Sequence, residues 1–227
     1  MPHHAASSPF TSYDAILLDI DGTLVDSNAA HAAAWANAFA EHGRHHPAET
    51  IRPLIGKGGD KLLQELAALD SESDEGRSIA AARARIFKER YLPAVEATPG
   101  AEPFVQWLRT SGLAVVVATS AKREELKALL AVCDAVALAE KATTSDDAER
   151  SKPDPDIIEA ALQLSGASAR RAVMVGDTPY DIEAARRAGV ETIALRCGGW
   201  ADEDLRGAVA IFDDPAELLE RMRLPAA

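Results

Sequence analysis

The feature that most constrains the fold is a series of short, largely apolar runs that alternate with stretches of helical periodicity. Strands covered on both faces of a sheet have such continuous apolar runs, whereas half-exposed strands alternate polar and apolar residues. The predicted strands are residues 15–18, 113–118, 135–139, 172–175, 192–195 and 209–212. The predicted helices that separate or follow them are residues 104–109, 123–130, 156–164, 182–188 and 216–222. This series predicts an α/β fold with a Rossmann-like, doubly wound and mostly parallel sheet.

The alternation stops between residues 27 and 96, where the pattern is helical and rich in alanine. Gly, Pro and Asp/Ser breaks divide this interval. Its predicted helices are residues 29–42, 47–55, 60–69 and 75–91. Because the interval directly follows the first strand, it predicts an inserted α-helical cap domain at 27–96. The core domain would comprise 13–26 and 97–227, preceded by a flexible N-terminus at 1–12.

The charge of the chain restricts its partners. Its 36 acidic and 24 basic residues give a formal net charge of −12, a sign that repels nucleic acid. It also repels a small anionic substrate, so a phosphate site requires local positive charge or a metal ion. No apolar run approaches the roughly 18 residues needed to span a membrane. We therefore expect a cytoplasmic protein, acting as a monomer, without a membrane or nucleic-acid partner.

Polar side chains follow several of the predicted strands. In an open parallel sheet, ligands bind outside the carboxyl ends of the strands, so these side chains should meet at one edge. They are Asp19 and Asp21, Thr119 and Ser120, and Asp177 with Asp181, joined by Lys152 in a loop before a helix. Clustered carboxylates repel one another unless a cation or proton lies between them. Oxygen ligands without His or Cys favour Mg²⁺ as that cation.

Four motifs in order carry a resemblance to a known family. They are Asp19-Ile-Asp-Gly-Thr-Leu-Val-Asp-Ser27, Thr119 at the end of the second strand, Lys152-Pro-Asp-Pro-Asp156 and Gly176-Asp-Thr-Pro-Tyr-Asp181. This ordered set resembles the haloacid dehalogenase-like hydrolase superfamily over nearly the whole chain. The helical insert is similar to the small cap of the branch that contains phosphoglycolate phosphatase and β-phosphoglucomutase.

The resemblance implies a role for each catalytic residue. Asp19 would be the nucleophile that forms an aspartyl-phosphate. Asp21 would protonate the leaving alcohol and then take a proton from the attacking water. Thr119 would hydrogen-bond a transferring oxygen, and Lys152 would neutralise charge on the phosphate and the nucleophile.

The resemblance also implies a Mg²⁺ cofactor held by Asp19, Asp177 and the main-chain carbonyl of Asp21. Asp181 would act from outside the metal's ligand set, orienting a metal-bound water or the lysine. Capping of the following helix is the alternative role for Asp181. A small phosphorylated metabolite is the expected substrate.

The candidate substrate-binding residues are Gly22, Thr23, Ser120, Lys57 and His31. Gly22 allows a tight turn that brings backbone N–H groups close to the phosphoryl oxygens. Ser120 could contribute only its backbone amide. Lys57, or Lys61 nearby, could meet a substrate anion or belong to a Gly-rich turn with solvated lysines. His31 could face the cleft or pack inside the cap.

Three functions fit these residues. A phosphatase is favoured because Asp21 provides the acid that an alcohol leaving group needs, whereas dehalogenases and phosphonate hydrolases of the superfamily lack that acid. A phosphomutase of the β-phosphoglucomutase type is the alternative. Such mutases carry a cap-loop arginine three residues after a glycine, and counting from Gly56 that position is Gly59. An inactive binding module of the same fold is the third possibility.

Overall fold

The computed structural model describes residues 12–223 and centres on a six-stranded sheet. The strands are β1 (Ala15–Leu18), β2 (Ala114–Ala118), β3 (Ala142–Thr143), β4 (Ala172–Gly176), β5 (Glu191–Leu195) and β6 (Ala210–Phe212). Their order is β3-β2-β1-β4-β5-β6, and every pair is parallel. β1 therefore lies inside the sheet between β2 and β4, with Ile16 in register with Val115 and Val173.

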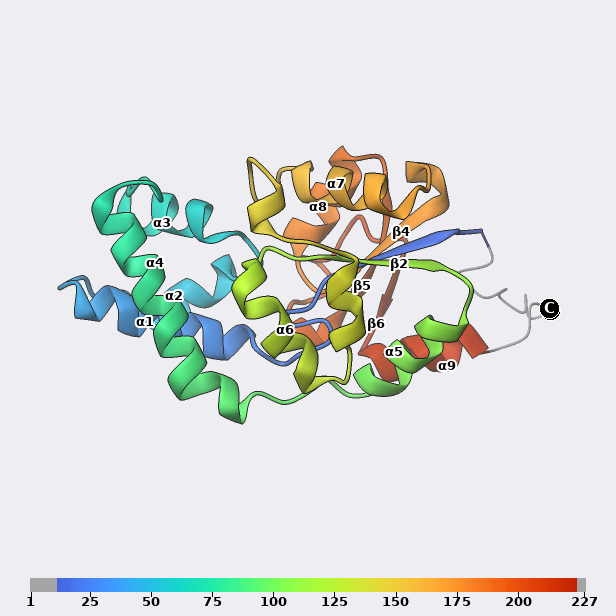
Figure 1. Ribbon diagram of the computed structural model, residues 1–227, viewed down its shortest axis with the longest axis horizontal. Coiled ribbons are helices and arrows are strands. Elements are labelled where there is room, and N and C mark those ends of the chain that lie inside the picture. The colour runs from blue at the N-terminus through green and yellow to red at the C-terminus, as the bar shows by residue number, and fades with distance from the viewer. Residues whose placement is uncertain (1–11, 224–227) are drawn as a thin grey trace.

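Helices cover both faces of the sheet (Figure 1). They are α5 (Ala101–Thr110), α6 (Arg123–Val132), α7 (Asp156–Ser165), α8 (Pro179–Arg187) and α9 (Pro215–Arg223). Alternate residues of a strand point to opposite faces. Ile16 and Leu18 join the apolar core that includes residues of α5, α6 and α9, whereas Ala15 and Leu17 join residues of α7 and α8. Continuous apolar strands are thus explained by two buried faces.

Between β1 and α5 the chain forms a helical insert, which lies beyond one end of the sheet (Figure 1). Its α-helices are α1 (Asn28–Glu41), α2 (Ala48–Ile51), α3 (Gly59–Ala67) and α4 (Asp74–Ile86). Short 3₁₀ turns at 52–54 and 92–94 and a π-helical stretch at 87–91 complete it. α1 and α4 pack against each other, with Trp35 and Phe39 buried on α1. We use "the insert" for residues 28–94.

The predicted fold class is confirmed, with one strand misplaced. The apolar run 135–139 is not a strand: Val136–Glu140 forms a 3₁₀ helix, and β3 follows at Ala142–Thr143. Ala135 N donates to Leu130 O at 2.8 Å, and Leu138 N donates to Ala135 O at 2.8 Å, so the chain turns tightly after α6. A short apolar run does not by itself distinguish a strand from a helical turn.

Two other predictions stand as they were made. The boundaries of the cap at 27–96 remain a prediction, and residues 1–11 of the expected flexible N-terminus lie outside the described part of the chain. Within residues 12–223, no helix is long and apolar enough to cross a membrane.

Candidate active site

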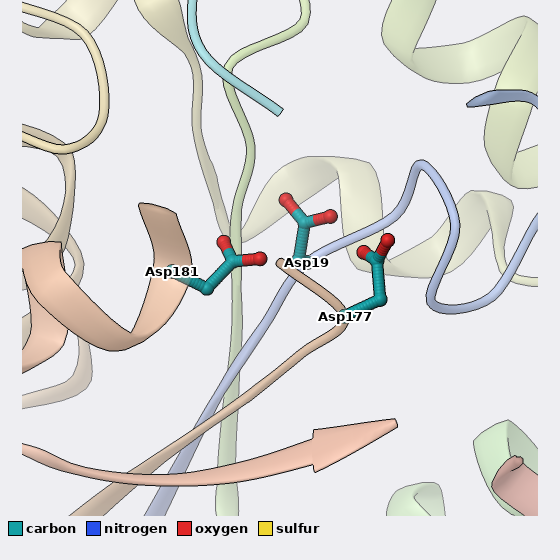
Figure 2. A group of neighbouring side chains, drawn as sticks. All are labelled: Asp19, Asp177 and Asp181. Atoms are coloured by element: carbon teal, nitrogen blue, oxygen red, sulfur yellow. The ribbon is translucent and has the colours of Figure 1, made fainter. Parts of the chain in front are cut away.

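Three carboxylates converge at the carboxyl edge of the sheet (Figure 2). Asp19 directly follows β1, Asp177 directly follows β4, and Asp181 lies in the first turn of α8. Each offers an oxygen, and these three oxygens lie within 4.8 Å of one another. All three side chains are buried. The parallel order β1–β4 places Asp19 and Asp177 side by side, as the strand-end argument predicts.

Lys152 is the cation of this cluster. Its Nζ donates to Asp19 Oδ1, Asp181 Oδ1 and the carbonyl of Ala118, each at 2.7 Å. The lysine is 1% exposed, and burial alone would lower its pKa. The carboxylates of Asp181 and Asp19 outweigh that burial and raise the pKa of Lys152 above its usual value, so its ammonium stays charged.

Asp181 contacts Lys152 and also caps the following helix. Its Oδ1 accepts from Lys152, while its Oδ2 accepts from Thr178 N at 3.0 Å and Thr178 Oγ1 at 2.7 Å. Together with the bond from Asp181 N to Thr178 Oγ1, these contacts form a capping box at the start of α8. The helix cap therefore fixes the carboxylate that holds the lysine.

The carboxylate of Asp177 is held by Thr23 of the loop after β1 and by Asn28, the first residue of α1. Thr23 Oγ1 donates to Oδ1 at 3.0 Å, and Asn28 Nδ2 donates to Oδ2 at 2.9 Å. A Cβ on Gly22 would lie 2.2 Å from Oδ2, and one on Gly198 would lie 1.9 Å from it. Gly22 also has a φ of +79°, which favours glycine. Both glycines thus provide the space in which Asp177 sits.

These residues fit a magnesium ion. The donors are buried carboxylate oxygens, the ligand type that Mg²⁺ prefers. Burial, and then the neighbouring Asp181 carboxylate, raise the pKa of Asp177 to about 7. Three carboxylates opposite one ammonium leave an excess of negative charge that a divalent cation would balance. Asp19 and Asp177 belong to the predicted ligand set, and the carbonyl of Asp21 as a third ligand stays a prediction.

Asp21 faces the insert. Its Oδ1 lies 2.8 Å from His31 Nε2 and accepts from Ser27 Oγ at 2.5 Å. The His31 ring stacks on Phe87 with centroids 3.9 Å apart, which fixes the imidazole. Burial would raise the pKa of Asp21, but His31, Ser27 and Arg83 together lower it below its usual value. His31 therefore contacts the candidate acid rather than simply packing inside the insert.

A cavity of about 50 Å³ lies between the core and the insert. The core side contributes Asp19, Asp21, Thr119, Ser120, Ala121 and Glu125, and the insert side contributes His31, Trp35, Ile55, Gly56 and Arg83. The larger cavities at 201–206 and 211–221 lie away from the carboxylates and contain none of the predicted site residues. The cavity of interest is therefore the small one above Asp19.

Several residues predicted to bind phosphate or substrate already form hydrogen bonds within the protein. The hydroxyl of Ser120 donates to Gly56 O of the insert at 3.2 Å. The N–H groups of Gly22 and Thr23 donate within their own turn, to Val25 O and Ile20 O. Thr119 Oγ1 lies at the cavity and accepts from the N–H of the residue two positions later at 3.1 Å.

The two lysines of the insert loop have partners elsewhere. Lys57 Nζ forms an ion pair with Glu65 at 2.5 Å and lies 4.8 Å from the ring centroid of Tyr180. Lys61 Nζ pairs with Asp154 of the core at 2.6 Å. Neither lysine lines the cavity above Asp19. Substrate binding by Lys57 stays a prediction that this arrangement does not favour.

Sequence reasoning missed three residues of the site. Asn28 orients Asp177, while Arg83 of α4 and Glu125 of α6 line the cavity. Asn28 directly follows the first motif, which ends at Ser27, and that position is the one signal by which it could have been found. Arg83 and Glu125 lie on helices far apart in the sequence and belong to no motif, so only the packing of the insert on the core brings them together.

Comparison with known proteins shows the family of the chain. The family model described as haloacid dehalogenase-like hydrolase matches residues 16–195. A phosphoglycolate phosphatase of Rhodospirillum rubrum is 30% identical over 224 residues, covering 93% of this chain and 91% of the relative. A validoxylamine A 7'-phosphate phosphatase of Streptomyces hygroscopicus subsp. limoneus is 28% identical over 186 residues, covering 81% and 85%.

A solved structure shares the whole fold. The crystal structure of a hydrolase from Pseudomonas syringae superposes with a TM-score of 0.86 at 28% identity, covering 95% of this chain and all of the other. The chain belongs to the haloacid dehalogenase-like hydrolase family. The resemblance drawn from the four motifs is thereby confirmed, and both sequence relatives bear the names of phosphatases.

Proposed function

We propose that this protein is a Mg²⁺-dependent phosphatase that hydrolyses a small phosphate monoester through an aspartyl-phosphate on Asp19. The observation that carries the proposal is the contact of Lys152 Nζ with Asp19 Oδ1 at 2.7 Å, beside two further buried carboxylates. Burial raises the pKa of Asp19 well above its usual value, and the charged Lys152 acts in the opposite direction by favouring the ionised carboxylate that attacks phosphorus. The family and the named relatives support the same activity.

The reaction proceeds in two displacements. A carboxylate oxygen of Asp19 attacks phosphorus, the ester P–O bond breaks, and Asp21 transfers a proton to the departing oxygen. Asp21 must gain that proton in the reacting complex, because His31, Ser27 and Arg83 lower its pKa in the free site. Water then attacks the aspartyl-phosphate, gives a proton to Asp21, and releases inorganic phosphate as the Asp19 O–P bond breaks. Lys152 and Thr119 stabilise charge on the phosphoryl oxygens. Asp19 and Asp177 would hold Mg²⁺, which supplies positive charge opposite the dianionic phosphate.

The residues of the insert give less support to a phosphomutase. Gly59 has no side chain to hold a second phosphate, and a Cβ there would lie 3.1 Å from the ring of Trp35, a tight contact. Lys57 and Lys61, which might supply a cation instead, are paired with Glu65 and Asp154. A second phosphate of a bisphosphate intermediate would therefore lack an evident partner.

The direct test is release of phosphate from small phosphate monoesters, with Mg²⁺ and with a chelator. We expect Mg²⁺-dependent release by the wild type and none by Asp19→Asn, which keeps the shape of the side chain but removes the nucleophile. Equal release by the two proteins would refute the proposed role of Asp19. Absence of release from any ester by the wild type would favour the inactive binding module.

A further inference from the structure

An ion pair between an arginine and a glutamate joins the insert to the core at the cavity. Arg83 on α4 donates from Nη1 to both carboxylate oxygens of Glu125 on α6, at 2.7 and 2.8 Å. The side chains are only 13% and 11% exposed. Both residues line the cavity above Asp19. The proposed phosphatase chemistry uses neither of them.

Each member of the pair is held in place from its own side. The guanidinium of Arg83 lies over the ring of Trp35, 5.3 Å from its centroid. Glu125 lies in the first turn of α6, where the helix dipole favours a negative charge. The pair is thus built from two positioned groups, one contributed by the insert and one by the core.

The pair does not use all the donors of Arg83. Both hydrogen bonds to Glu125 come from Nη1, and Nε is buried without a hydrogen-bond partner among residues 12–223. A buried N–H without a partner costs free energy until an acceptor reaches it. Arg83 therefore has one donor without a partner, while its charge is already balanced by Glu125.

The size of the cavity constrains how a substrate enters. Its volume of about 50 Å³ corresponds to a few water molecules, fewer than the heavy atoms of a phosphate ester. A substrate can therefore be held only when the insert moves away from the core. Because Arg83 belongs to the insert and Glu125 to the core, a leaving group bound between the two parts would have a guanidinium on one side and a carboxylate on the other.

Only some leaving groups satisfy both sides. A hydroxyl group accepts a hydrogen bond from the guanidinium and donates one to the carboxylate, because it has both functions. A carboxylate or a second phosphate would pair with Arg83 but would face Glu125, and two like charges brought together in a buried site repel strongly. The same repulsion would act against a bisphosphate.

We propose that Arg83 and Glu125 select a compact, uncharged, hydroxylated leaving group, so that the substrate is a phosphate ester of a small polyol or sugar rather than of a carboxylic acid. This inference rests on the proposed phosphatase function and narrows its substrate class. The observation behind it is that Arg83, a cation of the insert that lines the cavity, is already paired with the core carboxylate of Glu125.

Three phosphate esters of nearly equal size test the proposal. 2-Hydroxyethyl phosphate and 2-phosphoglycolate differ only in a hydroxymethyl against a carboxylate group, and ethyl phosphate carries neither. We expect the wild type to hydrolyse 2-hydroxyethyl phosphate with a kcat/KM about tenfold or more above that for 2-phosphoglycolate. Glu125→Gln should reduce that ratio by about tenfold, because it frees the charge of Arg83 for an anion.

Two further variants make the result specific. Glu124→Gln removes the same charge from an exposed position on the same helix and should leave the ratio unchanged. Arg83→Gln should lower kcat/KM for 2-hydroxyethyl phosphate relative to ethyl phosphate, without improving 2-phosphoglycolate. Each ratio is taken within one preparation, so partial loss of folded protein cancels.

The outcomes distinguish a wrong substrate assignment from a wrong phosphatase function. The substrate assignment would be wrong if the wild type preferred 2-phosphoglycolate to 2-hydroxyethyl phosphate. It would also be wrong if Glu125→Gln and Glu124→Gln had the same ratio of kcat/KM for these two esters. In either case, hydrolysis of ethyl phosphate would still support the phosphatase function. Failure of the wild type to hydrolyse any of the three esters with Mg²⁺ would overturn both.

Discussion

The two sides of the cavity are built by different means. On the core side, Asp19 and Asp177 directly follow strands, and the register of those strands sets their spacing. On the insert side, Arg83 and Trp35 project from helices whose position depends on how the insert packs. The core side is also densely bonded, since Lys152 alone makes three hydrogen bonds of 2.7 Å, whereas Nε of Arg83 has no partner among the described residues.

This difference suits the core side to the reaction at phosphorus and the insert side to the choice of substrate. Groups that must meet phosphorus in one geometry benefit from a sheet edge, where backbone hydrogen bonds fix each side chain. Groups that must admit and release a substrate benefit from a mobile side with donors to spare. We therefore expect changes on the core side to reduce the rate of every reaction, and changes on the insert side to alter which ester is used.

The largest effect is expected at the lysine of the core side. Lys152→Met keeps the length of the side chain but leaves the Asp19 and Asp181 carboxylates buried without their cation. We expect kcat to fall roughly 10²–10³-fold for every substrate, as for loss of one group that stabilises transition-state charge. Steady-state phosphate release on ethyl phosphate measures it.

The matched control is Lys61→Met, which removes an insert lysine paired with Asp154. That pair is partly solvent-exposed, so its loss should change kcat less than about twofold. Equal losses in the two variants would mean that the lysine on the insert contributes to the chemistry, and the division between the two sides would fail.

Two glycines with similar φ angles, one on each side, differ in the space around them. Gly22 in the core and Gly43 in the insert have φ values of +79° and +72°. A Cβ on Gly22 would meet Asn28 Nδ2 at 2.1 Å and Asp177 Oδ2 at 2.2 Å, whereas one on Gly43 would meet nothing within 4 Å. Gly22→Ala should therefore destabilise the protein by about 3 kcal/mol, against about 1 kcal/mol for Gly43→Ala.

Urea denaturation of both variants measures these values. Because only Gly22→Ala displaces Asp177, only that variant should also lose Mg²⁺-dependent activity. If Gly22→Ala and Gly43→Ala lower the free energy of unfolding equally and Gly22→Ala remains fully active, the turn after β1 is not the rigid support that its contacts indicate.

The core side could be predicted from sequence because its signals are local. An apolar strand followed by Asp19, and another followed by Asp177, place two carboxylates at one edge once the sheet is known to be parallel. The strand 135–139 was wrong because a short run of Ala, Val and Leu suits a 3₁₀ turn as well. Arg83 and Glu125 could not be predicted, because no spacing in the sequence shows which helix faces meet across a cavity.

Magnesium should stabilise the protein through the core side. A ligand at 100 times its Kd adds about 2.7 kcal/mol, which corresponds to a rise in Tm of about 5–10 °C for a chain of this size. We expect that rise for the wild type and less than about 2 °C for Asp177→Asn. Asp154→Asn, which alters an acid outside the cluster, should behave as the wild type does. Thermal melts with Mg²⁺ and with chelator measure both.

The smallest effect is expected on the insert side, at Trp35. Its ring supports the guanidinium of Arg83 at 5.3 Å, an interaction of about 0.5–1 kcal/mol. Trp35→Leu keeps an apolar side chain but removes that support, so Arg83 should meet a leaving group less well. KM for 2-hydroxyethyl phosphate should rise about two- to fivefold with kcat nearly unchanged, while ethyl phosphate, which does not engage Arg83, should show no such rise. A fall in kcat for both esters would instead place Trp35 with the chemistry of the core side.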